Sequence, residues 1–223
     1  MLSACSARET GTPAIETGVA DATPNYDPTV TSVPFLVDDL FVPSGCMGDC
    51  SASVTIDENC SERSSVDAQG QCHHFVYSLN TAPGALGWAG VLWQTADQNW
   101  GSLPGRKIAP GGTFLHFYAK TSGSNATLTI LVGALNANDG GKACKNGNGC
   151  ASLSCVNGAC TAPTHDTLDL SQDEELDANW TEFSIPFDGK SYGSEVLSGF
   201  GWTTVMPPKT SKIEFYADDL RWE

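Results

Sequence analysis

The chain has 223 residues, of which 26 are acidic and 11 basic, so its formal net charge at pH 7 is −15. This length accommodates one sizeable all-β domain, and the negative charge argues against nucleic acid as a partner and against charge-driven binding to anionic lipid. The chain lacks an apolar run of about 18 residues, so no segment is predicted to span a bilayer. Nine cysteines indicate an oxidising, extracytoplasmic compartment in which disulfides persist.

The first five residues carry a candidate anchoring motif. Leu2-Ser3-Ala4-Cys5 resembles the bacterial lipobox, which implies cleavage before Cys5, lipidation of its thiol and contact with a membrane only through that lipid. Eight cysteines then remain, enough for four disulfides. The alternative is an unpaired cysteine on a floppy terminus. Residues 6–32, rich in Thr, Ala, Pro, Gly and Glu and without hydrophobic periodicity, predict a disordered linker that tethers the folded domain.

The folded domain is predicted to span residues 33–223, and two strand-like runs near its ends share the sequence Asp-Asp-Leu. The runs are Pro34–Val42 and Ile213–Trp222. Carboxylates in a half-buried strand are costly unless they are paired or bound to metal. If the first and last strands lie side by side, the aspartates converge, and hard oxygen ligands favour calcium. The alternative is that each run ends at its aspartates in a solvated turn.

Four cysteines follow the first run in a stretch rich in polar and turn residues. Disulfides among Cys46, Cys50, Cys60 and Cys72 are predicted, with the connectivity open. The sequence Cys72-His73-His74 offers zinc as the alternative. Zinc is disfavoured because no Cys-x2-Cys pair is present and adjacent histidines in a strand point to opposite faces.

The remaining domain is predicted as short strands separated by Gly and Pro turns, and no segment shows a helical stripe with caps. Repeated short strands of this kind indicate an all-β antiparallel sandwich or a barrel. The predicted strands are His73–Leu79, Trp88–Gln94, Thr113–Lys120, Ala126–Ala134, Thr181–Phe187, Ser198–Val205 and Ser211–Trp222.

Residues 142–162 have a different composition and are predicted to be a small insert. They contain four cysteines and almost no large apolar group, so they cannot build a core and are expected to be held by two disulfides. Metal binding by four thiolates is the rival, which the spacings do not favour. The cysteines are Cys144, Cys150, Cys155 and Cys160.

Three of the chain's six tryptophans lie between Gly87 and Gly101, next to several amide side chains. Within a strand Trp88 and Trp93 point to opposite faces, so one can lie in the core while the other faces outward. Trp100 follows in a polar loop. Exposed indoles beside amides suit a sugar, because pyranose rings combine apolar C–H faces with hydroxyls. The alternative is that all three tryptophans pack in the core.

Several short motifs, taken together, resemble the galactose-binding-like jelly-roll domains of bacterial surface lipoproteins, which look like carbohydrate-binding modules. The resemblance covers roughly residues 33 to 223 apart from the cysteine insert. It implies an antiparallel jelly-roll sandwich, a structural calcium near the terminal strands, and a glycan on a concave sheet face or loop rim. The motifs are Asp39–Asp49, Trp88–Gly101, Leu197–Trp202 and Phe215–Trp222.

The resemblance also implies particular site residues. One departure is Cys46, which stands where an aromatic residue is expected before Met-Gly-Asp and suggests an added disulfide. The implied calcium ligands are Asp39, Asp49, Asp218 and Asp219, and the implied sugar-binding residues are Trp93, Gln94, Asn99, Trp100 and Trp202.

Three functions compete. The leading prediction is non-catalytic binding of a polysaccharide or oligosaccharide at the cell surface by a lipid-anchored or secreted protein. A glycoside hydrolase or polysaccharide lyase needs two suitably placed carboxylates, or a base with a cation, and Glu182, Asp188 and Glu195 sit in no recognisable catalytic context. A structural or adhesive protein would use the same aromatic patch for protein contacts. The oligomeric state is left open.

Overall fold

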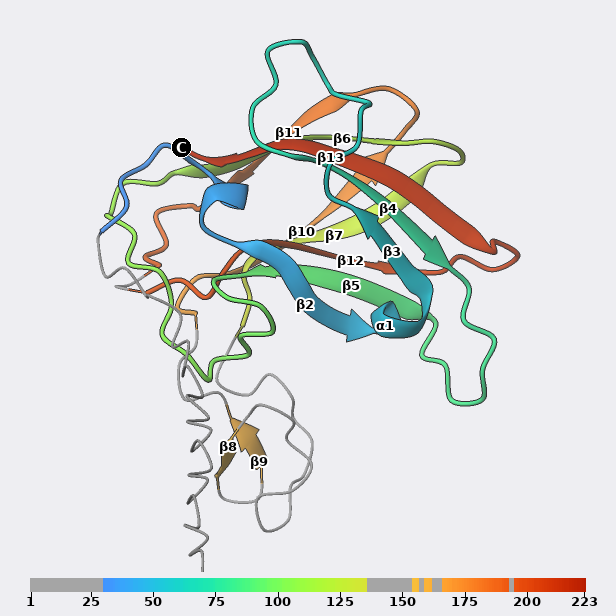
Figure 1. Cartoon of the computed structure of the whole chain (residues 1–223), viewed down its shortest axis with the longest axis horizontal. Coiled ribbons are helices and arrows are strands. Elements are labelled where there is room, and N and C mark those ends of the chain that lie inside the picture. Colours follow the sequence, from blue (N-terminus) through green and yellow to red (C-terminus); the bar gives the residue numbers. More distant parts are fainter. Residues whose placement is uncertain (1–29, 136–153, 157–158, 162–165, 193–194) are drawn as a thin grey trace, which may run out of the picture.

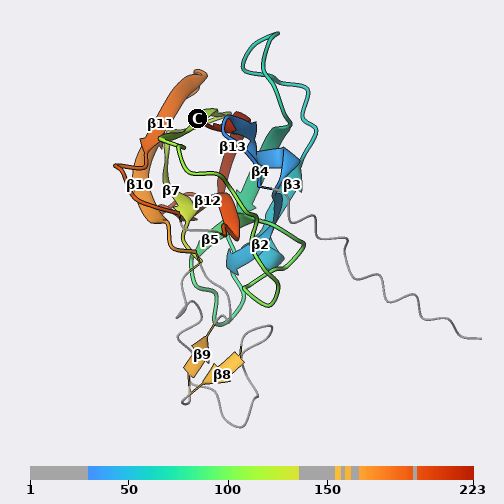
Figure 2. The same cartoon turned by 90° about the vertical axis from the view of Figure 1, so that its left-hand side faces the viewer.

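The computed structural model describes residues 30–135, 154–156, 159–161, 166–192 and 195–223. Two antiparallel sheets pack face to face around one hydrophobic core (Figures 1 and 2). This arrangement confirms the predicted all-β sandwich of the jelly-roll class. Among the described residues, the helices are the short η1 (Val37–Asp39) and α1 (Cys50–Ser53), and none is long and apolar enough to cross a membrane.

The six-stranded sheet has the order β11-β6-β13-β4-β3, and β1 pairs with β13 beside this path. Its strands are β1 (Phe35–Leu36), β3 (Val54–Asp57), β4 (Cys72–Ser78), β6 (Phe114–Thr121), β11 (Thr181–Pro186) and β13 (Lys212–Trp222).

The five-stranded sheet has the order β10-β7-β12-β5-β2. A separate hairpin, β8 (Ser154–Val156) with β9 (Ala159–Thr161), lies within the predicted insert. The five strands are β2 (Val42–Gly48), β5 (Trp88–Gln94), β7 (Ala126–Gly133), β10 (Asp169–Leu176) and β12 (Ser198–Val205).

The first and last strands lie side by side, with Phe35 opposite Trp222, which is the condition under which the sequence led us to expect the aspartates to converge. The predicted strand over 34–42 is nevertheless interrupted, because η1 turns the chain at Val37 and buries that side chain. Three strands of the two sheets were not predicted: β2, β3 and β10. β2 occupies a stretch rich in Pro, Ser and Gly, and β10 is an edge strand dominated by polar residues.

The core follows from the alternation of side chains along each strand. In β6 the residues Leu115, Phe117 and Ala119 are buried between exposed or half-buried neighbours. Aromatic rings fill the centre, where the Phe75 ring lies 5.2 Å from Trp202 and 4.9 Å from Phe215 between ring centroids. Edge-to-face and offset contacts of this kind add to the burial of apolar area.

The prediction of disulfides among the first four cysteines is confirmed. Cys46 pairs with Cys50 and Cys60 pairs with Cys72, with Cα atoms 5.4 and 5.1 Å apart. The second bridge also rules out the zinc alternative, since it engages Cys72. Within the hairpin the backbones of Cys155 and Cys160 are paired. Cys5, Cys144, Cys150 and residues 6–29 of the predicted linker lie outside the described residues.

The two histidines after Cys72 point to opposite faces, as expected for neighbours in a strand. His73 is fully buried, and its Nε2 lies 2.9 Å from Asp38 Oδ1. His74 is half-buried and contacts Glu214 at 3.0 Å. Each histidine therefore has a carboxylate partner within the protein.

Asp218 is fully buried in β13 and is neutralised by an arginine. The Arg63 guanidinium contacts both carboxylate oxygens of Asp218, at 2.9 Å and 3.1 Å, and the Ser64 amide donates to the same group. A buried charge is tolerated when it is paired and hydrogen-bonded in this way. Arg63 therefore fastens the 58–71 loop to the central strand of the six-stranded sheet.

Replacing Arg63 by Ala is expected to lower the free energy of unfolding by about 3 kcal/mol, because it leaves Asp218 buried without a counter-charge. Urea denaturation measures the loss. The control is Lys212→Ala, which removes an exposed ion pair with Glu214 and is expected to change stability little. Equal, small effects of the two substitutions would contradict this role for Arg63.

A second buried carboxylate, Asp166, connects the segment after β7 to the start of β12. It accepts hydrogen bonds from the Leu197 amide at 2.6 Å and the Leu135 amide at 3.2 Å, and the Ser198 hydroxyl at 2.8 Å. Burial outweighs these bonds and raises the pKa of Asp166 from 3.8 to about 6. The folded protein therefore holds this proton more tightly than the unfolded chain.

Because its folded pKa is raised, Asp166 stabilises the fold as pH falls from about 6 towards 4, where the folded form is protonated and the unfolded form is ionised. The free energy of unfolding is expected to rise by on the order of 3 kcal/mol across this window, and Asp166→Asn is expected to abolish this rise. Chemical denaturation between pH 7 and pH 4 measures the difference, with the exposed Asp188→Asn as control. A wild-type pH profile that Asp166→Asn leaves unchanged would be inconsistent with this assignment.

Candidate functional site

The outer face of the five-stranded sheet is open around one tryptophan. In β5 the side chains of Ala89, Val91 and Trp93 belong to the core. The alternation of the strand therefore turns Trp88 and Gly90 to the opposite, outer face. Trp88 is half-buried there.

A straight row of side chains crosses this face, because the strands are in register. Each member is the direct cross-strand partner of the next, and all lie on the outer side of the sheet. From β2 to β10 the row is Met47, Gly90, Thr203, Thr129 and Asp173.

Neighbouring groups pack closely around Gly90, the second member of the row. A Cβ atom at Gly90 would lie 2.5 Å from the Trp202 carbonyl oxygen and 2.6 Å from the Thr203 methyl carbon, so a larger residue does not fit without a shift. The missing side chain keeps the surface between Met47 and Thr203 flat.

Beside this row lies a hollow of about 330 Å³. Val205, opposite Trp88 across the strand pair, is 70% exposed and adds an apolar surface next to the indole. On the other side the Thr129 hydroxyl donates to the Asp173 carboxylate at 2.7 Å. The hollow thus joins an aromatic and aliphatic part to a hydroxyl and carboxylate part. It is lined by Trp88, Thr127, Thr129, Asp173, Thr203, Thr204, Val205 and Pro207.

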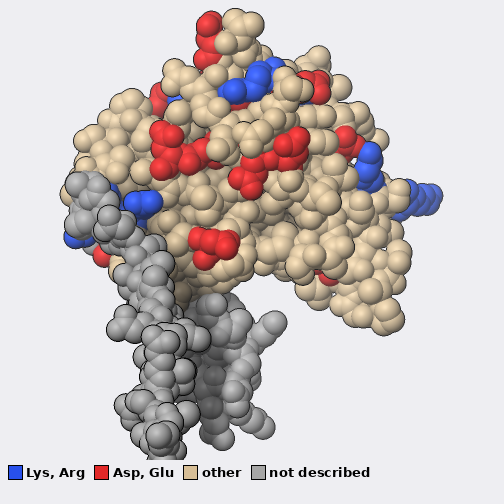
Figure 3. Space-filling view, viewed as in Figure 1, with Lys and Arg blue, Asp and Glu red and all other residues tan. Residues whose placement is uncertain are grey.

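The charge around this hollow is negative. Asp173 and its neighbour on the same face, Glu175, are exposed, and none of the described residues that line the hollow is basic. Acidic residues are also frequent elsewhere: Figure 3, viewed from the side of β2 and β3, shows Asp and Glu side chains across the middle of that side and most Lys and Arg side chains towards its margins. Such a surface disfavours anionic ligands.

The start of β5, and with it Trp88, is positioned by Asp49. Its carboxylate accepts from the Leu86 and Gly87 amides at 3.0 and 2.8 Å, and its own amide donates to the Trp88 carbonyl at 2.8 Å. The hydrogen bond from Leu86 is the main reason that the pKa of Asp49 is lowered. Gly48 lies directly against the Trp88 ring, since a Cβ atom there would be 2.8 Å from it.

Two members of the predicted sugar platform are in the core instead. Trp93 and Trp202 are both fully buried. Trp93 lies 4.8 Å from the Phe200 ring and 5.0 Å from the His73 ring. The prediction that these two indoles form an exposed platform is wrong, because each projects from the inner side of its strand.

The two predicted amides are also buried and serve the protein itself. Gln94 is fully buried and accepts a hydrogen bond from Ser44 at 3.1 Å. Asn99 is 1% exposed, and its amide donates to Thr95 while its carbonyl oxygen accepts from the Gly101 and Leu103 amides. Asn99 thus organises the loop after β5 and is not available to a ligand.

Trp100 is half-buried in that loop, and its contact with a sugar stays a prediction. Trp88, which is not among the predicted sugar-binding residues, is the tryptophan of β5 that faces outward. The composition of β5 does not separate the two faces, because Trp93 shares its face with Ala89 and Val91 while Trp88 shares its face with Gly90 and Leu92.

The predicted calcium ligands do not meet at one point. Asp49 binds backbone amides, Asp218 binds Arg63, and Asp219 contacts Arg221 at 2.8 Å. Asp39 is exposed in η1. Over the described ranges, no group of three or more His, Cys, Asp or Glu side chains is placed to hold a metal ion. These aspartates therefore do not fit a single calcium site as they are arranged.

The carboxylates weighed for an enzyme are likewise dispersed. Glu182 lies 3.4 Å from Arg221 on the six-stranded sheet, and Asp188 is exposed in a turn with φ of 49°. Glu195 accepts a hydrogen bond from the Gly105 amide. The three do not converge on one point, and Glu182 and Glu195 have separate partners.

No family model matches the chain, and no curated protein matches it significantly. Similar solved structures include the family 11 carbohydrate-binding module of a cellulosomal cellulase of Clostridium thermocellum, at 12% identity and a TM-score of 0.44, covering 87% of this chain and 95% of that chain. Another is the family 30 carbohydrate-binding module of a second cellulosomal cellulase of that organism. It has 9% identity and a TM-score of 0.38, with 86% of this chain and 94% of that chain covered.

A third similar structure is SGBP-B from a complex xyloglucan utilization locus in Bacteroides uniformis. It has 14% identity and a TM-score of 0.40, with 85% of this chain and 48% of that chain covered. The first two structures belong to the class that the sequence motifs resemble. Because these identities and TM-scores are low, the similarities do not indicate what this chain binds.

Calcium binding stays a prediction of the sequence, and thermal unfolding tests it. If calcium is structural, adding a chelator lowers the melting temperature, and restoring calcium in excess recovers it, because a ligand that binds only the folded state stabilises it. An unchanged melting temperature would overturn the prediction and leave Arg63 as the cation that neutralises Asp218.

Proposed function

We propose that the outer face of the five-stranded sheet binds a polysaccharide or oligosaccharide and performs no chemistry on it. The observation that supports this most is the pairing of the half-buried Trp88 indole with the exposed Val205 on one side of the hollow, and with Thr203, Thr129 and Asp173 on the other. No single residue of this set would indicate carbohydrate binding by itself. Their common orientation on one flat sheet face favours the proposal.

A pyranose ring matches both halves of this surface. Its C–H face packs on an indole and on aliphatic groups, which releases water from apolar area. Its hydroxyls donate to carboxylates and exchange hydrogen bonds with threonine hydroxyls. The threonines and Asp173 lie along the row that crosses the sheet, so an extended chain of sugars would lie across the strands.

The charge of the surface favours an uncharged glycan. The lining of the hollow includes Asp173 but no basic residue in the described chain, and the whole chain carries a net charge of −15. A uronic acid or sulfated sugar would be repelled. A neutral, hydroxyl-rich polysaccharide is therefore the proposed ligand class.

The proposed location is outside the cytoplasm, with the domain either secreted or attached to the cell surface through the lipid on Cys5. Two disulfides among the described residues support an oxidising compartment. A tether between anchor and domain would let the binding face reach a polymer away from the membrane.

Substituting Trp88 by Ala is expected to weaken binding to neutral polysaccharides at least about tenfold, equivalent to about 1.4 kcal/mol, because the apolar half of the surface is lost. Affinity electrophoresis and calorimetry against mixed-linkage β-glucan, xylan, xyloglucan and an acidic polysaccharide measure this. The matched control is Trp180→Ala, a half-buried tryptophan beside Lys120 and Tyr216 of the other sheet. Trp100→Ala tests the loop tryptophan in the same assay.

Binding that survives Trp88→Ala but is lost with Trp180→Ala would contradict the proposed face. If no neutral polysaccharide binds the folded, oxidised protein, the carbohydrate proposal fails. Concentration-dependent assembly of the same sample would then favour the structural or adhesive alternative.

A further inference from the structure

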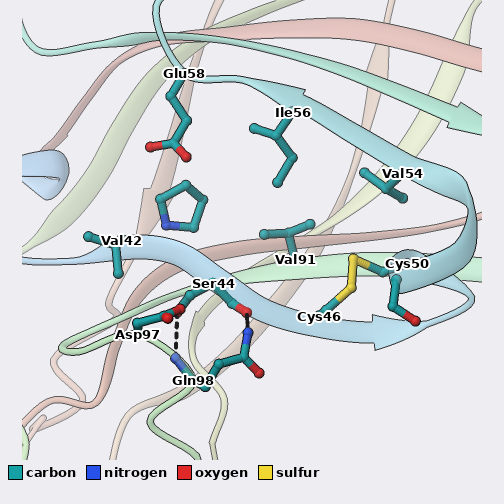
Figure 4. Close-up of a pocket in the computed structure, with 12 residues that line it drawn as sticks. Val42, Ser44, Cys46, Cys50, Val54, Ile56, Glu58, Val91, Asp97 and Gln98 are labelled. Atoms are coloured by element: carbon teal, nitrogen blue, oxygen red, sulfur yellow. Dashed lines mark hydrogen bonds between the residues drawn. A yellow bond between two sulfur atoms is a disulfide. The ribbon is translucent and has the colours of Figure 1, made fainter.

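The open side of the sandwich contains a groove that is separate from the proposed sugar-binding face. Within the described chain, β2 pairs only with β5, and β3 pairs only with β4, so both are edge strands of their sheets. The two edges lie on the same side of the molecule, and α1 joins them at one end (Figures 1 and 4). The groove between them has a volume of about 610 Å³.

The walls of the groove are aliphatic. Val54 and Ile56 of β3 are half-buried, whereas Thr55 and Asp57, which alternate with them, are exposed. Val42 on the facing strand is 43% exposed, and Val91 of β5 lies beneath it as part of the core. Figure 4 shows Val54, Ile56 and Val91 between the two ribbons and Val42 on the β2 ribbon, with the Cys46–Cys50 disulfide at one end of the groove.

The opposite end of the groove is acidic. Glu58, directly after β3, and Asp97, in the loop after β5, both line it. The loop of Asp97 is fixed to β2, because the Gln98 amide donates to the Ser44 hydroxyl at 3.0 Å and the Gln98 side chain donates to the Ser44 carbonyl. The carboxylate of Asp97 is therefore carried on an anchored segment.

The chemistry of this groove selects one kind of occupant. None of the described lining residues is aromatic, so the groove lacks the ring surface that a sugar would use. None is basic, so the carboxylates attract a cation and repel a second copy of this strongly acidic chain.

We propose that this groove binds an extended peptide strand with aliphatic side chains at alternate positions and Lys or Arg near one end. The edge of β3 presents backbone N–H and C=O groups that such a peptide can pair with, whereas on β2 Pro43 has no N–H and the Ser44 carbonyl already accepts from Gln98. Every second side chain then enters the space between Val42, Val54 and Ile56. The basic side chain reaches Glu58 and Asp97.

The test uses the full chain and a fluorescein-labelled peptide with valine at alternate positions and lysine between them, followed by fluorescence anisotropy. Three comparison peptides accompany it: one with glutamate in place of lysine, one with serine in place of valine, and one N-methylated on the backbone amides of one edge. Saturable binding of the first peptide is expected, and each comparison peptide is expected to bind at least about tenfold more weakly.

On the protein, the double substitution Glu58→Lys with Asp97→Lys is expected to weaken peptide binding at least about tenfold, and Val42→Asp to weaken it further. The control is Asp67→Lys, an exposed carboxylate farther along the 58–71 loop that does not line the groove, so this change alters the net charge outside the groove. Thermal melts verify that each variant is folded. Polysaccharide binding by the groove variants is expected to be unchanged, since Trp88 lies on a different face.

Three results would overturn the proposal: no binding of the lysine peptide, equal binding of the glutamate or N-methylated peptide, or equal loss of binding with Asp67→Lys and with the groove variants. The last would mean that general charge attraction accounts for the binding. Because polysaccharide binding is measured on the same variants, failure of the groove proposal and failure of the proposed function are separately observed.

Discussion

The fold depends most on how β5 is fixed in the middle of the molecule. The Trp93 indole N–H donates to Asp38 Oδ1 at 3.0 Å, and the same carboxylate contacts His73 Nε2 at 2.9 Å and accepts from the Gln71 amide. These contacts connect β5 of one sheet, β4 of the other and η1. A shift of β5 by one residue would remove Trp93 from the core and break them, so the packing of Trp93 decides which side chains of β5 face outward.

The burial of Trp93 determines which side chains of β5 form the outer face. With Trp93 inside, Trp88 and Gly90 are outside, and the strand register places Thr203, Thr129 and Asp173 in line with Gly90. Asp49 then holds the segment before Trp88 through backbone hydrogen bonds. The features that define the proposed binding face are thus positioned by backbone pairing and by one buried indole, which allows its exposed residues to be changed without loss of the fold.

The sequence was sufficient for the sandwich class, for the presence of disulfides among the first four cysteines but not for their connectivity, and for the opposite orientation of Trp88 and Trp93. It was not sufficient to say which of those tryptophans is inside, because alternation defines two faces and only the partner strands decide which one is buried. Edge strands such as β10 carry few apolar residues, so an alternation of buried and exposed positions does not predict them. Paired aspartates suggested a cation, and for Asp218 the cation present is Arg63, which lies 155 residues away in sequence.

The most direct test of the account is a two-dimensional NMR titration of the indole N–H signals with an oligosaccharide fragment of whichever polysaccharide binds. Six tryptophans are present, so each signal can be assigned by single substitution. The account predicts that the Trp88 signal shifts with the fraction bound, while the signals of the buried Trp93, Trp202 and Trp222 stay in place. A Trp88 signal that does not move at saturation, with the Trp180 signal moving instead, would contradict the assignment of the outer face as the binding site.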